Sequence, residues 1–193
     1  MGDDPGVSPR GSKTLTIFTI GHSTHPIEKF LEMLEANGIR QLADVRTIPK
    51  SRRNPQFGQD QLAGSLEQRG ICYVHLPGLG GLRHARKDSI NTGWKNASFR
   101  GYADYMQTDA FSVSLTKLMD LAAAMPTAIM CAEAVPWRCH RSLIADALTA
   151  RGIQVEHILS ASSRKPHAYT PFARVEGESV TYPALPLMEP DRL

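Results

Sequence analysis

Residues 129–146, with the sequence IMCAEAVPWRCHRSLIAD, bring several chemically active side chains together in a short stretch. Cysteine, glutamate, histidine and arginine all occur here, and these residue types serve as nucleophiles, proton carriers, metal ligands and anion-binding groups. An apolar run precedes them, and apolar residues at helical spacing follow them. The stretch therefore predicts a buried strand, a turn rich in functional groups, and a helix.

Glu133 is the first candidate for catalysis in this stretch. It lies at the end of the predicted buried strand, where a carboxylate is costly unless it is paired or used. An ion pair with a neighbouring arginine would explain its position as well as general acid–base catalysis would. His140 and His22 are further candidates for proton transfer, although packing against the helix is a simpler role for His140.

The two cysteines of the stretch are expected to differ in character. Cys139 stands where the helix is predicted to begin, and the helix dipole and the neighbouring arginines would lower the pKa of its thiol. Cys131 is expected to be a small buried apolar residue on the strand. A metal site at the segment of Cys139 and His140 is an alternative, but the spacing of these ligands is not a standard zinc spacing. We therefore expect no metal among the site residues.

A cysteine loop before a helix also occurs in phosphatases, where amide groups wrap around a phosphate. That loop places an arginine at a fixed, closer spacing after the cysteine, whereas Arg138 follows Cys131 with six residues between them. The segment is also poor in glycine, so the phosphatase interpretation is excluded. The stretch LADVRTIP, residues 42–49, has a passing likeness to the Asp-x-Arg strand of sulfurtransferase domains, but the expected cysteine loop is missing.

The elements that must position these groups alternate between strand and helix. This rhythm predicts an α/β fold with an open, mostly parallel five-stranded sheet, helices on both faces, and a short C-terminal hairpin. Strands are expected at 14–21, 39–46, 71–77, 127–134 and 153–159, helices at 26–38, 60–70, 102–126 (one or two) and 139–152, and the hairpin at 172–183. Residues 78–98 form a long connection. The expected organisation is a disordered tail (1–13), an α/β core domain (14–160) and a C-terminal extension (161–193).

Ligands of open α/β sheets bind beyond the carboxyl ends of the strands, and the chemically active residues of this chain follow its predicted strands. The arginines favour an anionic ligand, because a guanidinium group binds phosphate at two points, although many such residues are only solvated loop charges. The expected catalytic residues are Glu133, His140, His22 and Cys139, and the expected ligand-binding residues are Ser23, Asp44, Arg46, Arg52, Arg83, Arg138 and Arg141.

Other residues near these strand ends have weaker signals. Asp44 is expected to orient His22 or to clamp Arg46. Phe57, in the polar stretch SRRNPQFG, is a candidate for stacking on a base, although core packing is the commoner use of aromatic residues. The stretch GLGG, residues 78–81, predicts a flexible turn, and it has the spacing of neither a P-loop nor a dinucleotide fingerprint.

Four segments resemble domain-of-unknown-function family 488. They are TIGHSTHPIEKFLEMLEANGI, LADVRTIPKSRRNPQF, YVHLPGLGGLR and CAEAVPWRCHRSLIAD, and the tail HAYTPFARVEGESVTYP is similar to the family's ending. The resemblance spans nearly the whole core and implies no particular activity. The family-matching positions are Gly21, His22, Ser23, Asp44, Arg46, Pro49, Ser51, Arg52, Phe57, Gly80, Gly81, Cys131, Glu133, Cys139, His140 and Arg141.

The bulk composition is that of an ordinary globular chain of 193 residues, 41% hydrophobic and 21% charged. The net charge of +3 permits a phosphate-bearing or nucleic-acid partner without requiring one. The three cysteines do not suggest a disulfide framework. No apolar run approaches a membrane span, and the first residues lack the apolar core of a signal peptide, so we expect a cytoplasmic protein with no membrane partner.

These observations favour an enzyme, a hydrolase or a group transferase, that acts on a phosphate-bearing ligand such as a nucleotide or nucleic acid. No nicotinamide or flavin motif is present, so no cofactor is expected. One alternative is a non-catalytic domain that binds nucleic acid or a nucleotide. A second alternative is the metal-binding site at the segment of Cys139 and His140.

Overall fold

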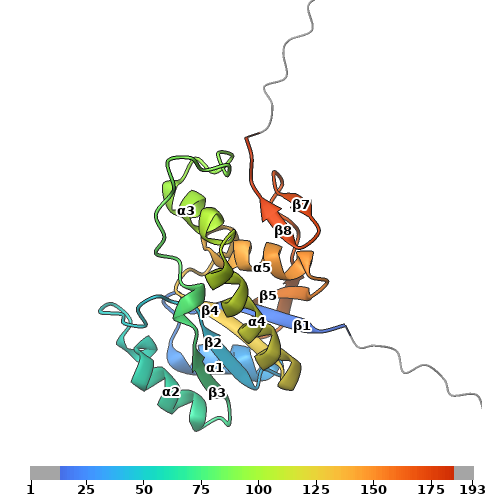
Figure 1. The fold of residues 1–193 in the computed structure, drawn as a ribbon. Coiled ribbons are helices and arrows are strands. Elements are labelled where there is room, and N and C mark those ends of the chain that lie inside the picture. Colours follow the sequence, from blue (N-terminus) through green and yellow to red (C-terminus); the bar gives the residue numbers. More distant parts are fainter. Residues whose placement is uncertain (1–13, 185–193) are drawn as a thin grey trace, which may run out of the picture.

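The computed structural model describes residues 14–184 (Figure 1). The elements, in chain order, are β1 (Thr16–Gly21), α1 (Ile27–Ala36), β2 (Gln41–Asp44), α2 (Gln59–Glu67), β3 (Cys72–His75), α3 (Ala97–Tyr105), α4 (Asp109–Ala124), β4 (Thr127–Cys131), α5 (Arg141–Ala150), β5 (Gln154–Ser160), β6 (Ser163–Pro166), β7 (Arg174–Glu176) and β8 (Ser179–Thr181). Short 3₁₀ helices span Pro55–Phe57, Pro77–Leu79 and Pro136–Arg138. The tail expected at 1–13 and the last residues of the extension lie outside the described residues.

The main sheet has six strands in the order β3-β2-β4-β1-β5-β6. The first five are parallel to their neighbours, and β6 runs antiparallel to β5. The α/β class and the parallel sheet are therefore confirmed, and the expected number of five strands is corrected to six. The sequence of β6, SRKP, shows no apolar alternation because all four of its side chains are exposed at the sheet edge.

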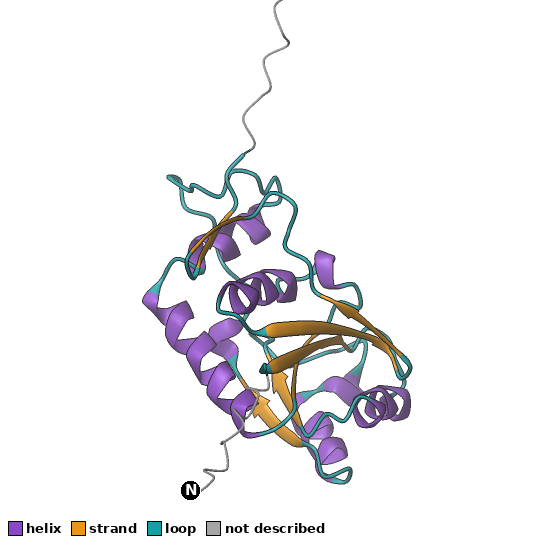
Figure 2. Ribbon diagram, turned by 90° about the vertical axis from the view of Figure 1, so that its right-hand side faces the viewer, coloured by secondary structure: helices purple, strands orange, loops and turns teal. Residues whose placement is uncertain are grey.

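Helices cover both faces of the sheet (Figure 2), as the alternation of elements predicted. Side chains of α1 and α2, such as Phe30 and Leu62, pack with Met130 of β4 in one core. Ile129 points the other way and packs with residues of α4 and α5. All five residues of β4 are buried, which explains the continuous apolar run at the start of that strand.

The region 102–126 holds parts of two helices, and α3 begins at Ala97, inside the expected long connection. The side chain of Asn96 caps α3 by accepting a hydrogen bond from the Ser98 amide at 2.8 Å. Thr108 caps α4 through the Phe111 amide. Within residues 14–184, no helix combines the length and the apolar character that crossing a membrane requires.

The expected C-terminal hairpin is formed by β7 and β8. It lies beside α5 (Figure 1), and Val180 and Tyr182 are buried in the same core as that helix. The hydroxyl of Tyr182 donates a hydrogen bond to the Asp146 carboxylate of α5 at 2.8 Å. The described part of the extension is therefore packed against the core.

Candidate functional site

A cavity of about 1010 Å³ opens at the carboxyl ends of the central strands. Its walls come from the loops that follow β1, β2, β3 and β4, and from the first turn of α3. The lining residues that carry polar or charged side chains are His22, Ser23, Thr24, Arg46, Thr47, Lys50, Ser51, Arg52, Arg53, Asn54, Ser98, Cys131, Glu133, Arg138, Cys139 and His140. The size is that of a site for a nucleotide-sized ligand.

The loops after β1 and β4 continue to pair beyond the strands. The amide of His22 donates to the Cys131 carbonyl at 3.0 Å, and the amide of Ser23 donates to the Ala132 carbonyl at 2.8 Å. Gly21 allows this close approach, because a Cβ there would collide with the Glu133 carbonyl group. Ser23 has a φ of 47°, a left-handed conformation that is uncommon for a residue other than glycine. Ser23 lines the cavity, and backbone strain of this kind is often found at functional sites.

Asp44 clamps Arg46, which is one of the two roles expected for it. The carboxylate accepts hydrogen bonds from the Arg46 amide at 3.0 Å, from its Nε at 2.9 Å, and from the Tyr73 hydroxyl at 2.8 Å. Burial alone would lower the pKa of Arg46, but the hydrogen bonds and the charge of Asp44 raise it. Asp44 has no exposed surface. The expected ligand contact of Asp44 is therefore corrected: it acts through Arg46, which does line the cavity.

His22 is a neutral residue that positions Arg46. Burial lowers the pKa of His22 to about 4, so its ring is uncharged at neutral pH. Nδ1 lies 2.8 Å from the Ser23 carbonyl oxygen, and Nε2 lies 3.5 Å from the Arg46 Nη1. The ring stacks on Phe57 at a centroid distance of 4.3 Å. With both ring nitrogens occupied, His22 is a poorer candidate for proton transfer than the sequence suggested. Phe57 is fully buried and offers no surface to a base.

Arg141 lies beneath the cavity and does not line it. The guanidinium group has no exposed surface, and its Nη2 donates to the Glu133 carbonyl oxygen while its Nη1 donates to Thr19 Oγ1 at 3.2 Å. The expected anion contact is therefore corrected. Arg141 positions the loop that follows β4, because a buried guanidinium group requires hydrogen-bond partners and finds them in that backbone.

Arg83 also does not line the cavity. Its Nε and Nη2 donate to the carbonyl oxygens of Gly80 and Gly78, each at 3.1 Å. Its guanidinium carbon lies 3.6 Å from the centre of the Tyr105 ring, in a cation–π contact. Arg83 therefore holds the turn after β3, and it is not one of the residues that line the cavity.

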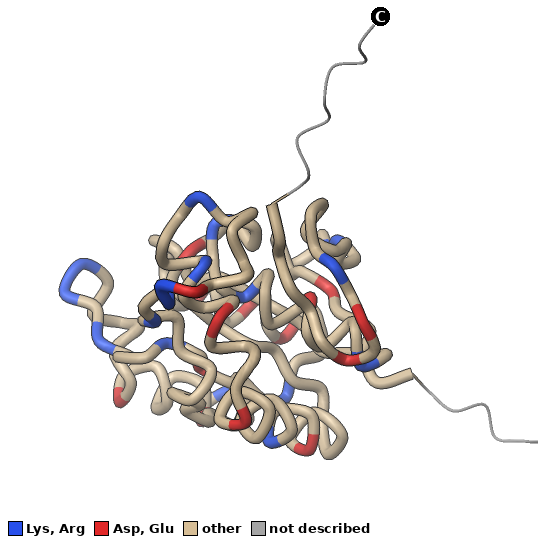
Figure 3. Tube along the Cα trace, turned by 45° about the horizontal axis from the view of Figure 1, so that its top comes forward, with Lys and Arg blue, Asp and Glu red and all other residues tan. Residues whose placement is uncertain are grey.

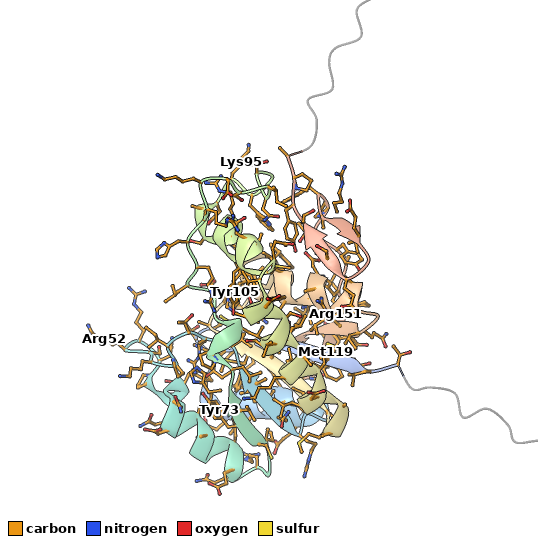
Figure 4. The ribbon with its side chains drawn as sticks, viewed as in Figure 1. Arg52, Tyr73, Lys95, Tyr105, Met119 and Arg151 are labelled. Carbon is orange, nitrogen blue, oxygen red and sulfur yellow. The ribbon has the colours of Figure 1, made fainter. Side chains whose placement is uncertain are left out.

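Five cationic side chains line the cavity: Arg46, Lys50, Arg52, Arg53 and Arg138. Four of them, all except Arg138, belong to the loop between β2 and α2, which protrudes from the body of the molecule and carries Lys and Arg positions in Figure 3. Figure 4 shows Arg52 at the outer end of this loop. Lys50 was not predicted as a site residue, although the basic run PKSRR indicated a cationic loop.

Glu133 is exposed on the cavity wall. Its carboxylate pairs with none of the basic side chains among residues 14–184. Only its backbone carbonyl is held, by Arg141. Among the described residues that line the cavity, Glu133 supplies the one carboxylate.

Cys131, Cys139 and His140 form a cluster in the cavity wall. Nδ1 of His140 lies 3.7 Å from the Cys139 Sγ and 3.9 Å from the Cys131 Sγ. A hydrogen bond from the Cys131 thiol lowers the pKa of Cys139, while the same contact and burial raise the pKa of Cys131. Cys131 is buried as expected, but its sulfur contacts polar partners. The spacing Cys-x₇-Cys-His indicated that these residues could form a cluster. The turn between β4 and α5 brings them together.

The fold and the site define the class of protein: an α/β protein with an open sheet and a cationic cavity at the carboxyl edge of its parallel strands. Within this class, the chain belongs to the DUF488 family, described as "Domain of unknown function DUF488", whose model matches residues 26–148. The resemblance found in the sequence is thereby confirmed. No curated protein and no solved structure matches the chain.

Proposed function

We propose that this protein is an enzyme, a hydrolase or a group transferase, that acts on a phosphate-bearing ligand such as a nucleotide or nucleic acid. The observation that carries the proposal is the charge of the cavity, where five cationic side chains face one carboxylate. Such a lining attracts an anion and would repel a cationic ligand. Guanidinium groups match the geometry of phosphate oxygens and bind them at two points.

The cations differ in how they would bind the ligand. Arg46 is only 7% exposed and is held by Asp44, so its guanidinium group is pre-organised at the cavity. Lys50, Arg52 and Arg53 are exposed on the protruding loop and can adjust to ligands of different size. We assign phosphate binding to Arg46 and to this loop.

The groups available for chemistry are Glu133, Cys139 and His140. Glu133 has a free carboxylate on the wall and is our candidate for proton transfer. Cys139 and His140 lie at the same cavity and complete the set of candidate catalytic residues. His22 is reassigned from proton transfer to the positioning of Arg46.

The proposal is tested by titrating ADP, inorganic phosphate and a single-stranded oligonucleotide into the protein and measuring binding by calorimetry. Replacing both Arg52 and Arg53 by alanine should weaken binding at least about tenfold, because each charge-assisted hydrogen bond contributes roughly 1.5–3 kcal/mol. Arg174→Ala on β7 is the matched control, since Arg174 is exposed and does not line the cavity. Equal binding by the double variant and the control, or no binding of any of the three probes, would contradict the proposal.

A second candidate is a non-catalytic nucleic-acid binding domain, which the exposed cationic loop favours. Glu133→Gln separates the two functions, because it removes the proton carrier and leaves all five cations in place. An enzyme would lose turnover of a phosphoester substrate and keep its affinity. A binding domain would show no turnover in either form and an oligonucleotide affinity that falls steeply with salt.

A further inference from the structure

We propose that Cys131, Cys139 and His140 bind a single zinc ion, with a fourth coordination position open to the cavity. The three ligand atoms, two Sγ and one Nδ1, all lie within 4.8 Å of one another. This inference stands apart from the proposed phosphate ligand, because it depends on the geometry of the cluster and not on the charge of the cavity.

The spacing of the ligand atoms fits tetrahedral coordination. With Zn–S bonds of about 2.3 Å and Zn–N bonds of about 2.0–2.1 Å, ligand atoms are separated by roughly 3.6–3.8 Å. The His140 Nδ1 lies 3.7 Å from one sulfur and 3.9 Å from the other. The two S···N distances would therefore need to shorten by only a few tenths of an ångström to hold the ion, and the two sulfurs lie within 4.8 Å of each other.

The imidazole ring is oriented as a metal ligand requires. Its Nε2 lies 3.3 Å from the Val45 carbonyl oxygen, so the proton belongs on Nε2 and the lone pair of Nδ1 faces the two sulfurs. Histidine ligands in metal sites commonly donate their other N–H to a backbone carbonyl in this way. The Tyr102 ring, 5.0 Å from the imidazole, packs against it from another side.

Gly81 explains how the imidazole fits against the turn after β3. A Cβ at this position would lie 2.6 Å from the His140 Nδ1, well inside van der Waals contact. The glycine therefore leaves room at the nitrogen that would bind the ion. The stretch GLGG matched no phosphate-binding motif. Its last residue, Gly81, must be a glycine because a side chain there would collide with the imidazole.

The position of the cluster predicts an open, reactive type of site. All three residues line the cavity, and within residues 14–184 no fourth histidine, cysteine or carboxylate joins the cluster. Two cysteines and one histidine with a fourth position left for water are one composition of catalytic zinc sites, whereas structural sites have four protein ligands. Two thiolates also balance the charge of the ion, which suits a buried pair of sulfurs.

The test measures metal binding directly. The full-length protein is stripped with a chelator and titrated with Zn²⁺ and, separately, with Co²⁺, whose thiolate complexes absorb in the near ultraviolet. We expect about one ion per chain by elemental analysis, and binding at least about tenfold weaker in Cys139→Ser and in His140→Gln. Cys72→Ser is the matched control, because Cys72 is an exposed cysteine on β3 and should leave binding unchanged.

Gly81→Ala provides a variant that keeps every ligand. Its methyl group should displace the imidazole and weaken Co²⁺ binding, while far-UV circular dichroism checks that each variant is folded. Wild-type protein that binds no zinc, or folded Cys139→Ser and His140→Gln that bind it as tightly as Cys72→Ser, would overturn the proposal. A Cys131–Cys139 disulfide in protein prepared under reducing conditions would do so as well. None of these outcomes depends on phosphate binding, so the two proposals fail separately.

Discussion

Single residues show how burial decides the role of a charged or polar group in this protein. Arg46 and Arg141 have the same side chain and both follow strands, but Arg46 reaches the cavity while Arg141 is fully covered. Arg46 pairs with the Asp44 carboxylate, whereas Arg141 donates through Nη1 and Nη2 to hydroxyl and backbone oxygens while its buried Nε has no partner among residues 14–184. The first is suited to ligand binding, and the second to positioning the loop that carries Glu133.

The lowered pKa of His157 predicts a pH-dependent contribution to the stability of the protein. Burial lowers its pKa to about 4, and His167, Arg141 and Lys165 act in the same direction against the opposing charge of Asp146. The unfolded chain binds a proton near pH 6.5, which the folded chain does not bind until pH 4. The unfolded state therefore holds more protons in this window, and the free energy of unfolding falls as the pH drops from 6.5 to 4.

Urea denaturation between pH 4 and pH 7.5 measures this effect. The contribution of His157 should be fully present above pH 6.5, and its loss below that pH amounts to at most about 1.4 kcal/mol per pH unit. His157→Gln keeps a polar side chain but cannot titrate, so its stability should fall less steeply over the same range. An identical slope in the variant and the wild type would show that His157 does not carry the effect.

At the scale of elements, the first turn of α3 delivers Ser98 and Phe99 to the cavity from a part of the chain that reads as a loop. The helix begins where Asn96 caps it, and its buried residues include Tyr102, which packs on His140. The capping residue Asn96 therefore determines where α3 begins, and so positions one wall of the cavity.

Asn96→Ala should lower the free energy of unfolding by about 0.5–2 kcal/mol, because it leaves the first amides of α3 without their acceptor. Thermal denaturation provides the measurement. Lys95→Ala is the control, since Lys95 is the exposed neighbour that makes no capping bond (Figure 4). Equal melting temperatures for the two variants would mean that the cap contributes nothing measurable.

Element types were largely predictable from the sequence, and element boundaries were less so. The strands β1 to β5 and the hairpin follow from β-rich or alternating runs, and α1, α2 and α5 follow from apolar spacing and their glycine stops. The strand β6 could not be predicted, because an edge strand with four exposed side chains leaves no hydrophobic pattern. The start of α3 was missed because its exposed first turn likewise shows no apolar spacing.

At the scale of the whole molecule, one buried network joins the C-terminal extension to the sheet. The Asp146 carboxylate accepts hydrogen bonds from the Tyr182 hydroxyl at 2.8 Å and from the Thr170 hydroxyl at 2.7 Å, and it pairs with His167 at 2.8 Å. His167 contacts His157 at 3.0 Å, which contacts Thr19 on β1. Arg141 donates both to Thr19 and to the Glu133 carbonyl oxygen, so the network connects the extension to the loop that follows β4.

Tyr182→Phe tests whether the extension folds together with the core. Removing the hydroxyl leaves one buried carboxylate oxygen with a partner fewer, so the free energy of unfolding should fall by about 1–3 kcal/mol. Tyr169→Phe is the control, because Tyr169 is exposed. Trp94 packs near Tyr182, so its fluorescence and far-UV circular dichroism should report one coincident transition. Two separate transitions would mean that the extension unfolds independently.

The sequence by itself determined the α/β class, the family, and the edge of the sheet at which polar residues gather. Hydrophobic periodicity is a local property of the sequence, and the alternation of strands and helices fixes the direction of the strands. The tertiary structure alone decided which of those residues meet. Buried Arg141 meets Thr19 of β1 and the Glu133 carbonyl of the loop after β4, and the His140 Nδ1 lies within 4 Å of both cysteine sulfurs. Such contacts join residues distant in the chain, and side-chain packing selects among them after the elements have formed.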